Sequence, residues 1–324
     1  MANKVLLIGL GQAGVSIGLA LARAEGEVGR IGYDPDKKTA NEAKASGAVD
    51  RLVSHPRLAV ESADLIIFDL PYQEVEEYLK YFGTKMQADA IIIDTAPIKA
   101  PFFKWAAQYL PAGCACVGAT PIVGDLDIVE PRPDGAADRF AGGLVAITAP
   151  PKTPERAIAL AIKLAKILEA EPFFLDIDEQ DSAAAAVEDL PALMSITMFQ
   201  STANSASWRE LQRIAGTLFM ESTELCNTDP TMLRKRIEGN REAILARLDA
   251  FAIEVSRLRN LVANAQDEDL VHYIKQAEST RSSWLRARAH GDWASQEALT
   301  PPSLESPGIM GSLFGFSRRK PKSD

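Results

Sequence analysis

The feature that most constrains this chain is the segment Gly9-Leu10-Gly11-Gln12-Ala13-Gly14, which follows a short apolar run from Val5 to Ile8. Four apolar residues are too few for a helix, so the run predicts a buried parallel strand. The amphipathic stretch from Val15 to Ala24 predicts a helix directly after the glycines. A strand, a Gly-x-Gly-x-x-Gly turn and a helix in this order are typical of a loop that holds the diphosphate of a dinucleotide. The glycines permit the tight turn and let the main chain approach the phosphates.

A carboxylate follows at the distance that such a loop requires. A second strand is predicted from Val28 to Tyr33, and Asp34 comes directly after it, twenty positions beyond Gly14. At this position a carboxylate accepts hydrogen bonds from the ribose of the adenosine and repels the additional phosphate of NADP. The sequence therefore favours NAD over NADP, although Lys37 and Lys38 add positive charge nearby. The alternative is a glycine-rich turn without a ligand, and the surrounding strands and helix favour nucleotide binding.

Composition excludes several classes of partner. The chain has 324 residues, enough for one large or two medium domains, and its net charge of −9 argues against binding to nucleic acid. We expect no membrane span, because no stretch approaches the ~20 apolar residues that a bilayer requires. Three cysteines make no disulfide framework and fit a reducing, cytoplasmic location. Cys114 and Cys116 alternate on a predicted strand, where buried thiols are expected rather than a metal site.

Residues 1–178 alternate short apolar runs with amphipathic stretches, the pattern of an α/β, Rossmann-type doubly wound parallel sheet that would bind NAD. Further strands are predicted at residues 49–53, 65–70, 90–94, 114–118, 144–148 and 173–177. Helices are predicted at residues 37–46, 73–82, 98–110 and 151–170. Ligands of such sheets bind beyond the carboxyl ends of the strands. The expected site loops are therefore residues 9–14, 34–38, 70–75, 94–99 and 118–127.

Residues 179–292 predict an all-α dimerisation and substrate domain. Apolar residues recur at helical spacing through residues 183–205, 208–226, 230–265 and 270–288. Their apolar faces exceed what one small bundle can bury, so we expect a homodimer formed through this domain. Residues 293–324 are rich in Pro, Ser and Gly and predict a disordered tail. Its Phe314, Phe316 and basic cluster leave contact with a membrane or partner as the less favoured alternative.

With these loops placed, the sequence resembles the prephenate/arogenate dehydrogenase family of tyrosine biosynthesis over about residues 3–290. Its landmarks occur in order after the glycine loop and Asp34: Asp64-Leu-Ile-Ile-Phe-Asp-Leu-Pro71, Asp94-Thr-Ala-Pro-Ile-Lys99, Gly118-Ala-Thr-Pro-Ile-Val-Gly124, Glu179-Gln-Asp181, Glu188-Asp-Leu-Pro-Ala192, Asp229-Pro230 and Asn240-Arg-Glu-Ala-Ile-Leu245. The resemblance implies an NAD-dependent oxidoreductase that takes a hydride from a cyclic alcohol, with loss of carbon dioxide. It also implies a homodimer and a small-molecule substrate.

The chain departs from the family at the positions that carry its chemistry. The family has a histidine where this chain has Thr120, and a neighbouring serine where it has Pro97. The family's His-Asp pair becomes Gln180-Asp181, and its Ser-His-Leu-Pro-His motif becomes residues 188–192, without histidine. The segment Phe219-Met-Glu-Ser-Thr-Glu224 replaces one that supplies an arginine to the substrate carboxylate. The chain's three histidines, His55, His272 and His290, match none of these positions.

The resemblance assigns candidate residues to each part of the site. Thr120 and Lys99 would occupy the catalytic corner. The substrate pocket would include Gln180, Glu188, Asp189 and Glu224. The cofactor would contact Gly9, Leu10, Gly11, Gln12, Ala13, Gly14, Asp34, Leu70, Pro71 and Thr95. Lys99 also fits a purely structural ion pair at the start of a helix.

Three functions remain open at this point. The first is an NAD-dependent dehydrogenase for prephenate or a related alcohol. In a variant of this hypothesis, the acidic residues Glu188, Asp189 and Glu224 select a cationic or polyhydroxylated substrate. The alternative for the acidic residues is a solvated helix face. The second is a dinucleotide-binding pseudoenzyme or sensor without dehydrogenase activity, which the missing histidines and arginine favour. The third, a scaffold that binds nothing, requires the glycine loop and Asp34 to be accidental.

Overall fold

The computed structural model describes residues 4–24, 28–124 and 135–289. The chain divides into two compact units, residues 1–271 and residues 272–324. The first unit contains the sheet and most of the helices. The predicted tail at residues 293–324 and the end of the expected loop at residues 125–127 lie outside the described residues.

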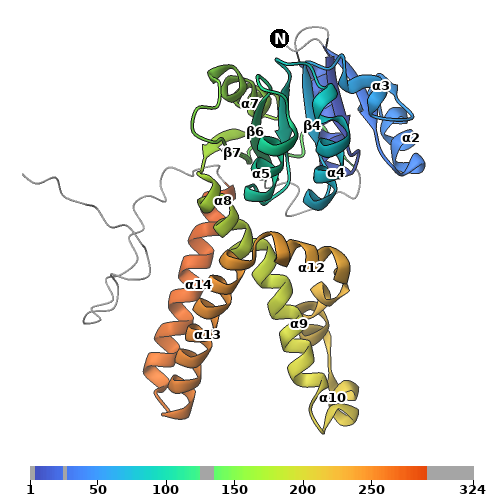
Figure 1. Cartoon of the computed structure of the whole chain (residues 1–324). Helices are drawn as coiled ribbons and strands as arrows, with labels where there is room; N and C mark the ends of the chain where they lie inside the picture. The colour runs from blue at the N-terminus through green and yellow to red at the C-terminus, as the bar shows by residue number, and fades with distance from the viewer. Residues whose placement is uncertain (1–3, 25–27, 125–134, 290–324) are drawn as a thin grey trace, which may run out of the picture. The chain divides into compact units, whose positions relative to one another are not determined.

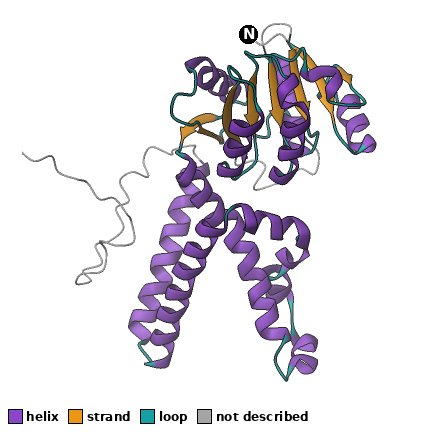
Figure 2. Ribbon diagram, in the orientation of Figure 1, coloured by secondary structure: helices purple, strands orange, loops and turns teal. Residues whose placement is uncertain are grey.

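The amino-terminal half forms one eight-stranded sheet with the strand order β3-β2-β1-β4-β5-β6-β7-β8 (Figures 1 and 2). The strands are β1 (Lys4–Ile8), β2 (Gly29–Tyr33), β3 (Arg51–Leu52), β4 (Leu65–Phe68), β5 (Ile91–Asp94), β6 (Ala115–Ile122), β7 (Leu144–Thr148) and β8 (Glu171–Phe174). The first six pair in parallel. This is the predicted Rossmann-type sheet, and each parallel strand occurs where the sequence predicts one.

Helices cover both faces of the sheet, and alternate residues of each strand point to opposite faces. One face packs against α1 (Gln12–Arg23), α2 (Lys37–Ala45) and α7 (Glu155–Ile167). The other packs against α3 (Arg57–Val60), α4 (Tyr72–Phe82) and α5 (Ala100–Tyr109). The central strands β4 and β5 are buried along their whole length, which explains why their sequences are continuous apolar runs.

The strand order reverses between β1 and β4, and this places two loops side by side. β1 pairs with β2 on one side and with β4 on the other, so that Ile8 lies opposite Phe68. The turn after β1 and the turn after β4 therefore emerge together at the carboxyl edge of the sheet. Open α/β sheets bind their ligands at this kind of crevice.

The end of the sheet differs from the prediction in three respects. β6 continues to Ile122, so Thr120 lies on a strand and not in the loop expected from residue 118. β7 pairs antiparallel with β6, with Thr120 opposite Ala146. β6 therefore extends past the carboxyl ends of its parallel neighbours because β7 supplies a hydrogen-bonding partner there. β8 covers Glu171–Phe174 and is exposed throughout, while the predicted strand end at Ile177 already begins a helix.

The remainder of the first unit is helical, as predicted, but more segmented. It contains α8 (Ile177–Ala184), a π-helical turn (Ala185–Asp189), α9 (Leu190–Ala203), α10 (Trp208–Ile214), α11 (Thr217–Ser222), a 3₁₀ turn (Glu224–Asn227), α12 (Pro230–Gly239) and α13 (Arg241–Ala263). α14 (Asp267–Ala289) starts in the first unit and continues into the second. The π turn comes directly before α9, which has Pro191 in its first turn, and π turns of this kind frequently occur at functional sites.

The helical region exposes many large apolar side chains. The most exposed in the first unit include Ile214, Leu218, Met220, Ile253 and Val262, each with at least 60% of its surface accessible. A groove of about 600 Å³ has Ile196, Phe199, Leu233 and Ile237 in its wall. Every helix in the described part of the chain is too short or too polar to span a membrane.

Phe102 tests the core on the second face of the sheet. Its side chain is 1% exposed and contacts Phe103 with ring centroids 5.1 Å apart. We expect Phe102→Ala to lower the free energy of unfolding by about 3–5 kcal/mol, because the truncation leaves a cavity in a closely packed layer. Urea denaturation measures this loss. The exposed Lys104→Ala on the same helix is the matched control, and an equal loss in both variants would contradict the packing described here.

Candidate active site

The glycine loop has no room for side chains at its first and third glycines. Gly9 has φ = +95°, and a Cβ there would lie 2.0 Å from the carbonyl oxygen of Asp69. A Cβ at Gly14 would lie 2.3 Å from the carbonyl oxygen of Gly9. At Gly11, by contrast, the nearest atom is 4.0 Å away, so the outer side of this residue is open. The first and third glycines are thus required by packing, and the second leaves space for a ligand.

Asp34 lies against this loop. Its Oδ2 accepts a hydrogen bond from the backbone N–H of Leu10 at 2.8 Å, and its Oδ1 accepts one from the backbone N–H of Asp36 at 2.8 Å. The carboxylate of Asp34 is therefore held beside the glycine turn, where the sequence predicts that a ribose is recognised. The loop and Asp34 together fit a nicotinamide dinucleotide.

The other predicted cofactor residues surround the same turn. Leu70 is 8% exposed, and its Cδ2 would be 3.1 Å from a Cβ on Gly9. Pro71 precedes α4, and Thr95 follows β5 with its hydroxyl directed toward β4. Sequence reasoning missed Arg139, whose Nη2 donates to Gln12 Oε1 at 3.2 Å and brings a positive charge to the loop. No motif in the sequence marks this arginine.

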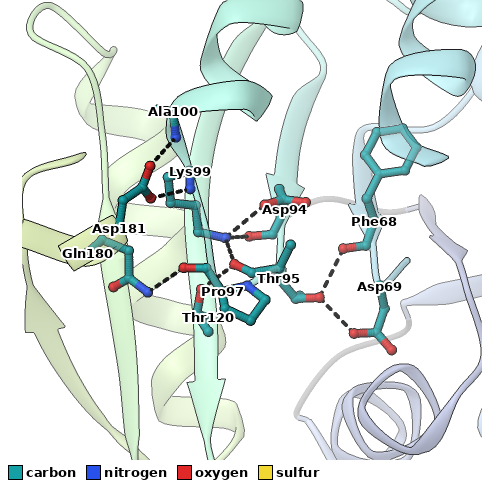
Figure 3. A network of polar contacts seen from close by, with 11 residues as sticks. Phe68, Asp69, Asp94, Thr95, Pro97, Lys99, Ala100, Thr120, Gln180 and Asp181 are labelled. Carbon is teal, nitrogen blue, oxygen red and sulfur yellow. Dashed lines mark hydrogen bonds and ion pairs between the residues drawn. The ribbon is translucent and has the colours of Figure 1, made fainter. Parts of the chain in front are cut away.

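Asp69 is a second residue that sequence reasoning did not single out. It follows β4, and its Oδ2 accepts a hydrogen bond from the backbone N–H of Gly14 at 2.6 Å. Its Oδ1 accepts one from the Thr95 hydroxyl at 2.7 Å (Figure 3). Burial raises the pKa of Asp69, the bonds from Thr95 and Gly14 oppose this, and the charges of Asp94 and Asp34 add to it. The available signal was an acidic residue at the end of an apolar strand.

Lys99 is completely buried and supports the loop after β5. Its Nζ donates to the carboxylate and the carbonyl oxygen of Asp94, each at 2.8 Å, and to the carbonyl oxygen of Ala96. An ammonium has three hydrogens, so all of its donors are used. Burial lowers the pKa of Lys99 and raises that of Asp94, and their attraction opposes both shifts. In this arrangement Lys99 has the structural role of a buried ion pair and presents no donor to a substrate.

Thr120 is also buried, and its hydroxyl donates to the carbonyl oxygen of Ala96 at 2.8 Å. The single hydroxyl hydrogen is therefore already committed, and what Thr120 offers a ligand is acceptor capacity. Lys99 and Thr120 both donate to the carbonyl oxygen of Ala96, so the two residues that the resemblance assigns to the catalytic corner lie close together.

Gln180 and Asp181 connect the helical region to the sheet region. Asp181 accepts hydrogen bonds from the backbone N–H groups of Lys99 at 2.5 Å and Ala100 at 3.1 Å, so it caps α5. Gln180 Nε2 donates to the carbonyl oxygen of Pro97 at 2.8 Å. Both side chains are 6% exposed. Gln180 and Asp181 thus position the loop that contains residues 95–99.

Glu188 and Asp189 share one cation. Arg236 Nη2 lies 3.0 Å from Glu188 Oε2 and 2.8 Å from Asp189 Oδ1. The Asp189 side chain is fully buried, and its Oδ2 has no hydrogen-bond partner within the described residues. Burial raises the pKa of both carboxyl groups, and Arg236 opposes the shift. Arg236 was not predicted from the sequence, because it lies on α12 among other charged residues.

Glu224 lies on a different element from this pair. It begins the 3₁₀ turn after α11, and its side chain is exposed. Arg236 forms its ion pairs with Glu188 and Asp189. The π turn places Glu188 and Asp189 together, immediately before α9.

Comparison with known proteins identifies the family. The family model for the nucleotide-binding domain of prephenate dehydrogenase matches residues 17–172, and the model for its dimerization domain matches residues 176–276. The chain belongs to the prephenate dehydrogenase family. This confirms the resemblance seen in the sequence, and with it a nucleotide-binding domain followed by a helical dimerization domain.

Individual relatives agree with this assignment. Prephenate dehydrogenase of Bacillus subtilis is 25% identical over 319 residues, which cover 97% of this chain and 84% of that protein. The structure of prephenate dehydrogenase from A. aeolicus with hydroxyphenyl propionate and NAD+ has a TM-score of 0.76 and 20% identity, covering 87% of this chain and 98% of that one. Synechocystis arogenate dehydrogenase has a TM-score of 0.71 and 22% identity, with 87% and 99% covered. At these identities the two structures show a shared fold.

The role of Lys99 is tested by breaking its ion pair. We expect Lys99→Met to lower the free energy of unfolding by about 3–5 kcal/mol, because Asp94 is then left buried without a partner. The double variant Lys99→Met with Asp94→Asn should recover part of the loss. Urea denaturation gives both values. A stable Lys99→Met protein that binds NADH normally but lacks activity would contradict the structural role.

Proposed function

We propose that this protein is a cytoplasmic, NAD-dependent dehydrogenase that oxidises a cyclohexadienol with loss of carbon dioxide, and that its substrate bears an ammonium group, as arogenate does. Membership of the prephenate dehydrogenase family supports the reaction class. The free cysteines Cys114, Cys116 and Cys226 suit a reducing compartment. The buried carboxylate of Asp189 carries the proposal for the substrate.

The preference for NAD rests on the charges around the loop. A dinucleotide with a phosphate on the adenosine ribose would meet the carboxylate of Asp34, which is fixed beside Leu10. Arg139 contacts the turn at Gln12, whereas Asp34 contacts it at Leu10. NAD, without that phosphate, avoids the repulsion.

The ammonium requirement follows from the charge balance at Glu188, Asp189 and Arg236. Two carboxylates face one guanidinium, and Asp189 Oδ2 keeps an unused acceptor in a buried position within the described structure. A second cation would satisfy this acceptor, and burial of an unpaired charge is costly. Prephenate carries a keto acid where arogenate carries an amino acid, so only arogenate supplies the cation. The charge of Glu188 opposes the lowering of the pKa of Lys99, which supports a place for the acidic pair near the loop after β5.

Thr120 would orient the ring alcohol. Its hydroxyl hydrogen is held by Ala96, so its oxygen is available to accept a hydrogen bond from a substrate hydroxyl. This would align the alcohol for hydride transfer without requiring Thr120 to act as a base, which a threonine does not do near neutral pH. The bound NAD supplies the hydride acceptor.

A homodimer formed through the helical region is the proposed assembly. The dimerization-domain match covers residues 176–276, and this region exposes Ile214, Leu218 and Met220. Exposed apolar side chains of this size favour burial against a second copy, since an exposed apolar patch commonly marks an interface.

An assay of both substrates tests the activity. With NAD+ present, we expect NADH absorbance to appear with arogenate, and kcat/KM to be at least about tenfold lower with prephenate, equivalent to about 1.4 kcal/mol of discrimination. A higher kcat/KM for prephenate would contradict the ammonium proposal and retain the reaction class. NADH binding without turnover of either substrate would instead favour the alternative of a non-catalytic dinucleotide-binding protein.

Asp189→Asn tests the residue that carries the substrate proposal. Loss of one charge-assisted bond to an ammonium costs about 1.5–3 kcal/mol, so we expect kcat/KM for arogenate to fall about 10- to 100-fold. The value for prephenate should stay level or rise, since a negative charge is removed. Glu242→Gln, on the exposed first turn of α13, is the matched control. An equal fall for both substrates would mean that Asp189 does not recognise the ammonium.

A further inference from the structure

The first turn of α1 is capped by a carboxyl group from another part of the chain, that of Asp69. The residue before this helix is Gly11, which has no side chain to cap the free N–H groups. Asp69, fifty-five residues after Gly14 in the chain, supplies the missing cap by accepting the Gly14 N–H at 2.6 Å. A Cβ on Gly14 would lie 3.0 Å from Asp69 Oδ2, so the carboxyl group lies directly against the loop. This end of the helix is also where the diphosphate of a dinucleotide would be held.

The charged side chains near Asp69 disfavour a deprotonated carboxyl group at this position when a diphosphate lies beside it. The charged groups that face Asp69 from the packed elements are Asp34, after β2, and Asp94, at the end of β5. Both are acidic, and Asp94 is already paired with Lys99. No ion pair joins Asp69 to a lysine or arginine within the described residues. Arg139 brings its positive charge to the same turn at Gln12, whereas Asp69 contacts the turn at Gly14. A diphosphate held at Gly14 would therefore bring further negative charge to a carboxyl group whose charged neighbours Asp34 and Asp94 are both acidic.

The hydrogen bonds of Thr95 show how a proton is accommodated. Thr95 Oγ1 lies 2.7 Å from Asp69 Oδ1 and 3.0 Å from the carbonyl oxygen of Phe68 (Figure 3). A hydroxyl has one hydrogen, so it can donate fully to only one of these two acceptors. The carbonyl oxygen of Phe68 also accepts the backbone N–H of Thr95 at 3.0 Å, so it keeps a partner in either case. If Asp69 Oδ1 carries a proton, the Thr95 oxygen can accept it while the Thr95 hydroxyl donates to Phe68. The site therefore accommodates the protonated carboxyl group as well as the carboxylate.

We propose that the protonation of Asp69 controls how tightly the dinucleotide binds at the glycine loop. The dinucleotide binds to the form of the protein in which this carboxyl group is protonated. This rests on the proposed function only in requiring that NAD binds at the glycine loop. Deprotonated Asp69 occupies the helix terminus as a competing anion. Protonated Asp69 remains a neutral cap for Gly14, and it leaves the diphosphate without a like charge beside it.

The proposal predicts a pH dependence with a definite sign. The pKa of Asp69 is raised in the protein, so the protonated form persists at higher pH than for an ordinary aspartate. Above that pKa, binding requires uptake of a proton, and the affinity for the dinucleotide falls by about tenfold per pH unit. Below it, the affinity is independent of pH. The dinucleotide in turn stabilises the protonated carboxyl group.

Binding of NADH, measured by calorimetry and fluorescence on the whole protein, tests this directly. In a pH titration that spans the raised pKa of Asp69, we expect the wild-type affinity to weaken above that pKa, with uptake of about one proton per NADH in the weakening range. Asp69→Asn keeps an acceptor for Gly14 and a donor for Thr95, and it carries no charge. Its affinity should be level across the titration, with no proton uptake, and it should exceed that of the wild type by about tenfold for each pH unit above the pKa.

Asp64→Asn is the matched control, because Asp64 lies at the opposite end of β4 and accepts a bond from the backbone N–H of Lys4. It should retain the wild-type pH dependence. Equal pH dependence in the wild type and Asp69→Asn, or no proton uptake by the wild type anywhere in the range, would overturn the proposal. Absence of NADH binding in all three proteins would instead overturn the proposed function. Proton counting on the wild type gives a result even if Asp69→Asn does not fold.

Discussion

The close approach of the turn after β1 to the end of β4 is the constraint on which the remaining arrangement depends. A side chain at Gly9 would overlap the carbonyl oxygen of Asp69, so only glycine allows the two turns to meet. Because the two turns are in contact, α1 begins at the edge of the sheet, and the N–H groups of its first turn point toward the crevice. The same contact brings the carboxyl group of Asp69 to Gly14. The position of the nucleotide loop and the position of Asp69 against it therefore both depend on the contact between these two turns.

A second set of contacts fixes the loop after β5. Lys99 is held by Asp94 and Ala96 from the sheet side, while Asp181 and Gln180 hold the backbone of residues 97–100 from the helical side. All of these groups are buried or nearly so, and each bond satisfies a polar group that would otherwise be costly inside the protein. The residues that the resemblance assigns to the catalytic corner thus hold this loop in place. Asp189, whose Oδ2 has no hydrogen-bond partner within the described residues, keeps an unused acceptor.

The acidic pair Glu188 and Asp189 has shifted pKa values. Burial raises the pKa of Glu188 and Asp189, and a single arginine balances them only in part. A buried carboxylate with an unused oxygen is expensive unless a ligand or a proton completes it. This physical cost is the reason for connecting the acidic pair to a substrate that carries a positive charge.

The sequence by itself determined the strand–glycine–helix opening, Asp34, the parallel strands and the helical second half, because hydrophobic period and glycine spacing are local properties of the chain. It also placed Lys99 and Thr120 at one corner through the family resemblance. Only the tertiary structure decided what these residues do, since the donors of Lys99 are used up by atoms of its own loop and the hydrogen of Thr120 by Ala96. Likewise, Asp69 reaches Gly14 across fifty-five residues, and Arg236 reaches Glu188 across forty-eight. Hydrogen bonds and ion pairs over such separations depend on how strands and helices pack, which no local pattern encodes.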